Sequence, residues 1–71
     1  MAKVAVNNTT WTEVLIGGGF CLSTQKMKYS FTGDDTGTLV INPDNQINSA
    51  SGKTLYAKSF SSFGEVTAVA E

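Results

Sequence analysis

The sequence predicts a small all-β protein folded as an antiparallel β-sandwich, with a small β-barrel as the alternative. Short runs of β-branched and aromatic residues recur along the chain, and turn-forming residues separate them at intervals of roughly 8–12 residues. Glycine, asparagine, aspartate, serine and threonine interrupt every stretch long enough to form a helix. With 71 residues the chain has room for one hydrophobic core, so we expect a single domain over residues 1–71.

Three strands are expected in the first half of the chain. Residues 10–16 are rich in β-branched side chains and end at a run of three glycines, which predicts a turn. Residues 20–25 alternate between two faces and form the second strand. Residues 28–32 alternate more regularly, and this spacing places Tyr29 and Phe31 in the core.

The second half of the chain predicts further strands at residues 38–41, 46–48, 54–59 and 65–71, for six or seven strands in all. The first of these is short and apolar after Thr38, which predicts a buried strand that ends before Pro43. In the last of them Val66, Ala68 and Ala70 share one face. The aspartates of residues 33–37 predict a hydrogen-bonded turn between strands.

Charge and composition exclude several functions. The net charge is −1 and only 15% of the residues are charged, which is too few basic residues for a nucleic acid partner. No apolar run approaches the roughly 18 residues of a membrane span or the length of a signal sequence. We therefore expect no nucleic acid, no membrane association, and synthesis in a cytoplasm.

No catalytic, metal or cofactor site is expected either. The chain has no histidine and one cysteine, Cys21, so it lacks the usual metal ligand sets and forms no internal disulfide. Without histidine, neither Cys21 nor any serine has an ordinary general base beside it, and no Ser-x-x-Lys pattern occurs. The sequence therefore predicts that Cys21 fills space in the core and that the protein is not an enzyme.

The aromatic residues are the best candidates for contacts with a partner. Trp11, Phe60 and Phe63 are predicted as interface anchors, because buried aromatic side chains dominate the energy of protein interfaces. The alternative is a glycan site in which Trp11 and Tyr56 offer flat apolar faces beside the polar side chains of residues 45–48.

Several short motifs, taken in order, resemble small accessory virion proteins of tailed bacteriophages. They are Trp-Thr at 11–12, Phe-Cys-Leu at 20–22, Thr-Gly-Thr-Leu-Val-Ile-Asn-Pro at 36–43, Leu-Tyr-Ala-Lys-Ser at 55–59, and Gly-Glu-Val-Thr-Ala-Val at 64–69. The resemblance covers roughly residues 10–71. Many of those proteins have a longer connection than residues 49–53 before the late strand.

This resemblance implies a structural role in the virion, as a capsid decoration protein, a tail or spike attachment protein, or the binding head of a fibre. It implies capsid or tail proteins as partners and a homo-oligomer, often a trimer. No catalytic residues and no cofactor come with it. We therefore expect a non-enzymatic virion protein made in the host cytoplasm, with a carbohydrate-binding head of a fibre or spike as the alternative.

Overall fold

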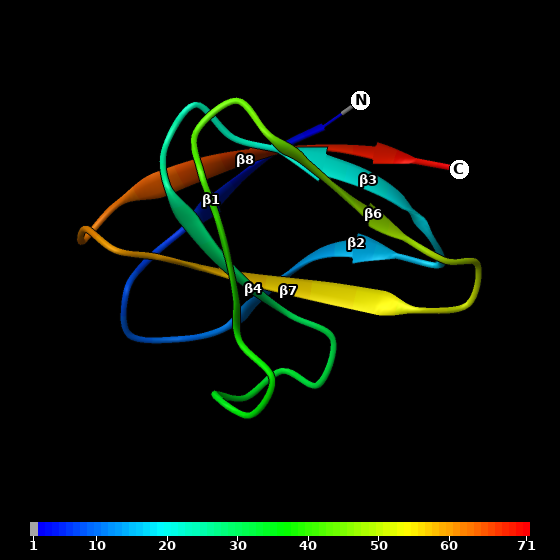
Figure 1. Cartoon of the computed structure of the whole chain (residues 1–71), viewed down its shortest axis with the longest axis horizontal. Helices are drawn as coiled ribbons and strands as arrows, with labels where there is room; N and C mark the ends of the chain where they lie inside the picture. Colours follow the sequence, from blue (N-terminus) through cyan, green and yellow to red (C-terminus); the bar gives the residue numbers. More distant parts are fainter. Residues whose placement is uncertain (1) are drawn as a thin grey trace.

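A computed structural model describes residues 2–71 and shows two antiparallel sheets packed face to face (Figure 1). The strands are β1 (Ala2–Val6), β2 (Thr12–Ile16), β3 (Gly19–Leu22), β4 (Met27–Ser30), β5 (Leu39–Ile41), β6 (Gln46–Ser49), β7 (Thr54–Ser59) and β8 (Gly64–Ala70). Sheet A has the order β1-β8-β3-β6, and sheet B has the order β2-β7-β4-β5. The sheets do not close into a barrel, so the predicted β-sandwich is confirmed. None of residues 2–71 belongs to a helix of membrane-spanning length and apolarity.

The strand pairing is that of one long antiparallel hairpin rolled onto itself. β1 pairs with β8, β2 with β7, β3 with β6 and β4 with β5. Rolling adds two further pairs, β3 with β8 and β4 with β7. Every connection except the one between β4 and β5 therefore crosses from one sheet to the other. This is the topology of an eight-stranded jelly roll.

The core lies between the two sheets and follows the two-residue alternation of the strands. In β7 the residues Leu55, Ala57 and Ser59 face inward, while the residues between them face the outer surface of sheet B. In β8, Val66 and Ala68 of the predicted face are buried, whereas Ala70 at the end of the strand is exposed. The buried apolar side chains are Val6, Val14, Leu15, Cys21, Met27, Tyr29, Ile47, Leu55, Ala57, Val66 and Ala68.

A β-bulge in β2 lets two consecutive residues enter the core. The register pairs Glu13 with Tyr56 and then Leu15 with Leu55, so Val14 is the extra residue. A bulge places two residues opposite one and turns the strand locally. Both Val14 and Leu15 are consequently buried, although neighbours in a regular strand point to opposite faces.

The strand β1 is not among the predicted strands, which brings the number to eight rather than six or seven. It pairs with β8 along its whole length, from Ala2 opposite Ala68 to Val6 opposite Gly64. Two of its five residues are alanine, which has a low intrinsic preference for strands. Pairing with β8 and the burial of Val6 stabilise the strand instead.

Two predictions of burial are wrong, and both concern the open edge of sheet B. The strand β4 ends at Ser30, so Phe31 leaves the sheet and is 40% exposed instead of entering the core. The strand β5 is an edge strand that pairs with β4 alone, and its residues Leu39 and Val40 are exposed. Only Ile41 packs against the core. The apolar composition of β5 thus reflects an exposed edge and not a buried position.

Candidate interaction surfaces

The connection between β7 and β8 presents both phenylalanines predicted as contact residues. The side chain of Phe60 is 49% exposed and that of Phe63 is 63% exposed. Around them, the Ser59 hydroxyl donates a hydrogen bond to the Ser61 carbonyl, and the Ser61 hydroxyl donates one to the Phe63 carbonyl, both at 2.7 Å. The serines satisfy the backbone of the connection, and the aromatic rings are left to face solvent. We call residues 60–63 the phenylalanine turn.

The end of the phenylalanine turn is anchored to the body of the sandwich. A Cβ atom on Gly64 would lie 2.7 Å from the Cβ atom of Ser59, so only glycine fits there. The next residue, Glu65, donates its backbone N–H to the side-chain oxygen of Gln25 at 3.1 Å and accepts a hydrogen bond from the Ser23 hydroxyl at 2.8 Å. The turn therefore leaves the sheet in a defined direction.

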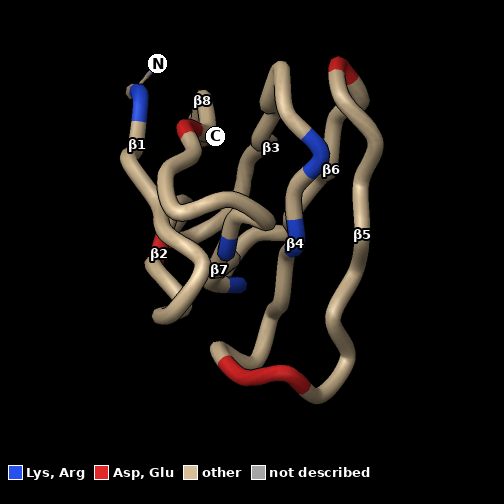
Figure 2. Tube along the Cα trace, turned by 90° about the vertical axis from the view of Figure 1, so that its left-hand side faces the viewer, with Lys and Arg blue, Asp and Glu red and all other residues tan. Residues whose placement is uncertain are grey.

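Two lysines lie beside the phenylalanine turn. The Nζ atom of Lys28 is 4.8 Å from the centre of the Phe60 ring, and that of Lys26 is 5.6 Å away. Cation–π contacts of this kind contribute about 0.5–1 kcal/mol at exposed sites. Lys28 is the second residue of β4 and Lys26 directly precedes that strand. Figure 2 shows basic positions in blue along this part of the chain. The turn thus combines two exposed rings with two positive charges.

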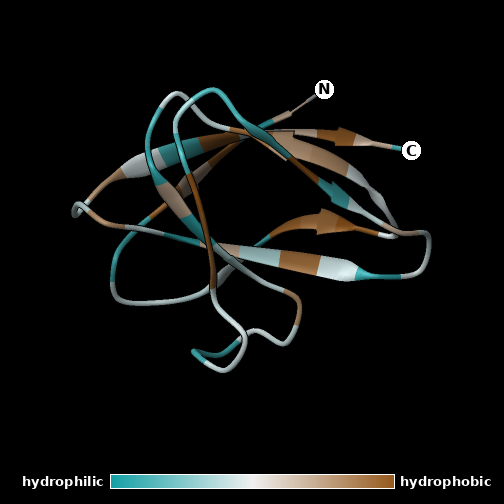
Figure 3. Ribbon diagram, viewed as in Figure 1, coloured by the Kyte–Doolittle hydropathy of each residue, from teal (hydrophilic) through white to brown (hydrophobic). Residues whose placement is uncertain are grey.

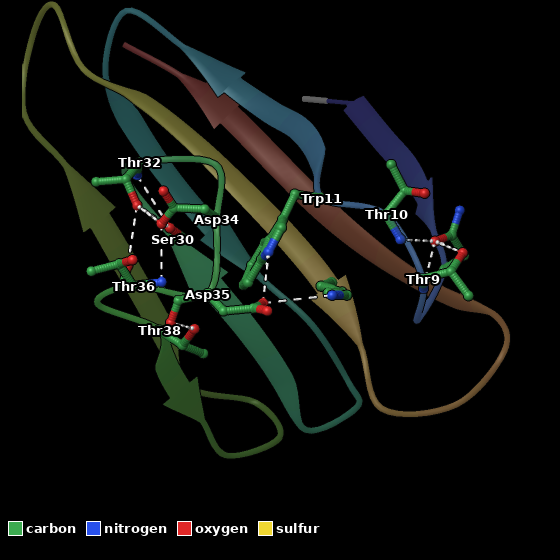
Figure 4. A network of polar contacts seen from close by, with 11 residues as sticks. Thr9, Thr10, Trp11, Ser30, Thr32, Asp34, Asp35, Thr36 and Thr38 are labelled. Atoms are coloured by element: carbon green, nitrogen blue, oxygen red, sulfur yellow. Dashed lines mark hydrogen bonds and ion pairs between the residues drawn. The ribbon is translucent and has the colours of Figure 1, made fainter.

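Trp11, the third predicted contact residue, is half-buried and held by its own chain (Figure 4). Its indole Nε1 donates a hydrogen bond to Oδ1 of Asp35 at 3.0 Å. The Nζ atom of Lys58 lies 3.6 Å from the same oxygen and 5.4 Å from the centre of the indole ring. The polar atom of Trp11 is therefore already bonded, which distinguishes it from the two phenylalanines.

The loop that contributes Asp35 is organised by its own polar side chains, as predicted for residues 33–37. Asp34 accepts hydrogen bonds from the Thr32 hydroxyl at 2.7 Å and from the Thr36 backbone N–H at 2.9 Å (Figure 4). These bonds favour the ionised carboxylate and lower the pKa of Asp34. The Thr38 hydroxyl donates to the Asp35 carbonyl at 2.8 Å. Both aspartates therefore serve the conformation of the loop.

The two predicted glycan residues, Trp11 and Tyr56, both contact this loop. A Cβ atom on Gly33 would lie 3.2 Å from the Tyr56 ring, so the loop backbone lies against that ring. The polar side chains predicted to accompany them do not come near. Gln46 and Asn48 hydrogen-bond to each other at 2.7 Å and are exposed on sheet A, in the opposite layer.

A hollow of about 430 Å³ lies on another part of the surface and was not predicted. It is lined by Phe31, Asn48, Ala50 and Lys53. The hollow joins an aromatic ring, which follows β4, with an amide and an ammonium group from residues 48–53. No sequence spacing connects them, because sheet packing brings these segments together.

An apolar groove of about 280 Å³ lies between the edge of sheet B and the end of sheet A. Its walls come from β1, β2 and β8, and we call it the alanine groove; its lining residues are Ala2, Glu13, Val14, Leu15, Ile16, Ala68 and Ala70. The residues that sheet A contributes to the groove are all alanine, whose methyl group is too small to fill the space. Ile16 is 70% exposed at the groove. In the sequence, this groove could have been inferred only from the alternating alanines Ala68 and Ala70 near the end of the chain.

The edge strand β5 is the third apolar part of the surface. Figure 3 shows it as one of the most hydrophobic segments of the chain. Its three residues carry no charge, and Val40 is 51% exposed. Exposed edge strands are usually protected by charged residues or proline, and the residues of β5 include neither.

Burial controls the chemistry of two reactive side chains, Cys21 and Tyr29. Cys21 is fully buried, and burial raises the pKa of its thiol to about 11, away from the reactive thiolate. Burial, followed by the nearby Cys21, also raises the pKa of Tyr29. Within residues 2–71, no group of three His, Cys, Asp or Glu side chains is placed to hold a metal ion. The location of Cys21 in the core confirms its predicted role as a filler.

Comparison of the chain with models of known protein families, with curated proteins and with solved structures gives no match.

Proposed function

We propose that this protein is a non-enzymatic assembly module of the kind found among the accessory virion proteins of tailed bacteriophages. It binds capsid or tail neighbours and forms an oligomer of its own chain. The observation that carries the proposal is the phenylalanine turn, where two aromatic side chains stand 49% and 63% exposed on an anchored backbone. Aromatic residues on a rigid support are the side chains that contribute most to protein interfaces.

The rest of the surface agrees with a role in binding other proteins. Besides the phenylalanine turn, the chain exposes apolar side chains along the alanine groove and on β5. Exposed apolar side chains that gather in patches rimmed by polar residues are typical of protein interaction sites. Jelly rolls also occur in viral capsid domains, although this fold hosts other functions and supports the proposal only by analogy.

The test is sedimentation equilibrium of the purified chain over a hundredfold range of concentration. We expect a reversible or stable oligomer. Phe63→Ser should weaken the association. The midpoint of thermal unfolding should not change, because the Phe63 side chain is mostly exposed and contributes little to the core. A matched control is Thr36→Ser in the loop between β4 and β5, which should not change association. A wild-type chain that remains monomeric throughout contradicts the proposed oligomer.

A carbohydrate-binding head is the second candidate, favoured by one observation. Trp11 and Tyr56 lie around the same loop on sheet B, as a pair of aromatic platforms requires. Trp11 is the single tryptophan, so its fluorescence reports this site without interference. Quenching by millimolar sugar that is lost in Tyr56→Ala would support a glycan site. An unchanged spectrum with a panel of neutral and acidic sugars would reject it.

A further inference from the structure

We propose that the phenylalanine turn of one copy docks in the alanine groove of a second copy, so that the protein associates head to tail. This inference rests on the proposed function, because it names the two surfaces through which the oligomer forms. It assigns a role to a groove that the sequence does not predict and to the lysines beside the turn.

The two surfaces lie at opposite ends of the molecule. The phenylalanine turn precedes β8, whereas the groove is formed by the end of β8 with the start of β1 and the end of β2. Figure 1 shows the turn at one end of the longest axis and the two termini toward the other. That axis measures 29 Å. A contact between such different surfaces is heterologous, so every copy can offer one turn and one groove.

The groove has the size and character to hold an aromatic ring. An apolar cavity of about 150 Å³ is large enough to bind benzene. The alanine groove has about 280 Å³, and all of its lining residues except Glu13 are apolar. The groove is therefore large enough to receive one phenylalanine ring. Its insertion would cover Ile16, which is 70% exposed in the single chain.

The charges on the two surfaces are complementary. Glu13 lies at the groove, and Lys26 and Lys28 lie beside the phenylalanine turn. The neighbouring charged residues Lys3 and Glu65 alternate onto the outward face of sheet A. Docking the turn in the groove brings the lysines toward Glu13. A groove-to-groove or turn-to-turn contact brings like charges together, so the charges favour the head-to-tail arrangement.

The test uses two variants that each disable one surface. Phe60→Ser combined with Phe63→Ser removes both rings of the turn, and Ala70→Trp fills the groove from an exposed position at the end of β8. Each variant alone should lose association by roughly 30-fold or more in sedimentation equilibrium. An equimolar mixture should form a complex of two chains and nothing larger, because one intact turn and one intact groove remain.

One control variant and one alternative groove variant complete the test. Val40→Ser removes a comparably exposed apolar side chain from β5, away from both surfaces, and should leave association unchanged. If Ala70→Trp lowers the midpoint of unfolding, Ile16→Glu replaces it as the groove variant. This substitution places a charge in the groove at a side chain that is already 70% exposed, so it should not disturb the fold.

The outcomes separate this inference from the proposed function. If the wild type associates and the turn and groove variants associate equally well, the head-to-tail contact is wrong while the oligomer stands. Loss of association in Val40→Ser alone would assign the contact to β5 edge pairing and overturn the inference. A wild type that stays monomeric contradicts the proposed oligomer itself, and the docking with it.

The charge pairing has its own test. Glu13→Lys should weaken association by about two- to fivefold, the range of exposed ion pairs. Adding Lys26→Glu and Lys28→Glu to that variant should restore it. Glu13 and Lys26 are exposed and Lys28 is half-buried, so the triple variant should lose no more stability than the cation–π contacts with Phe60 supply. A triple variant that associates no better than Glu13→Lys overturns the assigned pairing.

Discussion

The two connections that flank the strands of sheet B are built in opposite ways. The loop between β4 and β5 folds back on its own sheet, where Asp35 binds Trp11 and Gly33 lies against Tyr56. The phenylalanine turn between β7 and β8 instead holds its backbone with serine hydroxyls and leaves Phe60 and Phe63 facing solvent. The side chains of the first connection are used in contacts within the chain, whereas the aromatic side chains of the second are free to contact a partner.

The difference shows that aromatic residues in loops need not have the same role. Trp11 has a hydrogen-bond acceptor for its indole N–H and an ammonium group beside its ring. Phe63 has no polar atom to satisfy and is 63% exposed. Substitutions in the loop should therefore change the free energy of unfolding, whereas substitutions in the turn should change association.

The largest effect on stability is expected from Gly33→Ala. Gly33 has a φ of 78°, and a Cβ atom there would press on the Tyr56 ring at 3.2 Å. We expect a loss of about 2 kcal/mol in the free energy of unfolding, measured with urea. Gly37→Ala is the matched control, because Gly37 has a φ of 72° but open space around it. It should cost about 1 kcal/mol, and equal losses would show that contact with Tyr56 contributes nothing.

A smaller loss is expected from Trp11→Phe. The substitution keeps an aromatic ring for Lys58 but removes the N–H that donates to Asp35. We expect about 1 kcal/mol less stability in the same urea experiment, the usual contribution of one hydrogen bond. Asp35→Asn retains an acceptor for the indole and should lose less than Trp11→Phe. The reverse order would mean that the ion pair with Lys58 matters more than the hydrogen bond.

In the phenylalanine turn, Phe63→Ser should change the free energy of unfolding by less than about 0.5 kcal/mol, as is usual for surface substitutions. The exposed ring makes few contacts that unfolding would remove. Association should fall in the same variant. A stability loss as large as that of Gly33→Ala would place Phe63 in the structure of the domain and remove the contrast between the two connections.

The smallest effect is local and depends on pH. Hydrogen bonds from Thr32 and Thr36 lower the pKa of Asp34 in the folded chain. A lowered folded pKa contributes stability above the pKa of the unfolded state, and this contribution is lost as the pH falls through the folded pKa. Acidification should therefore lower the protection of the Thr36 amide against hydrogen exchange, measured by NMR relative to the intrinsic exchange rate at each pH. Asp34→Asn should remove that pH dependence, and amides of the phenylalanine turn should not share it.

Local sequence patterns predicted much of this fold because strand alternation depends on neighbouring residues. The inward face of β8, with Val66 and Ala68 buried, follows from a two-residue period. The same reasoning fails at β5, because an apolar run has the same composition in a central strand and at an edge. It also fails at Phe31, because the strand ends at Ser30, two residues earlier than the pattern predicts.

The sequence alone therefore determined the fold class, seven of the eight strands and the core position of Cys21. It also selected Phe60 and Phe63, since an aromatic pair beside serines in a turn is a local feature. Tertiary structure decided the rest. β1 forms because β8 supplies its hydrogen-bonding partners, and the alanine groove exists because the ends of three strands meet there. These features depend on contacts between residues that are far apart in the chain, which no local pattern records.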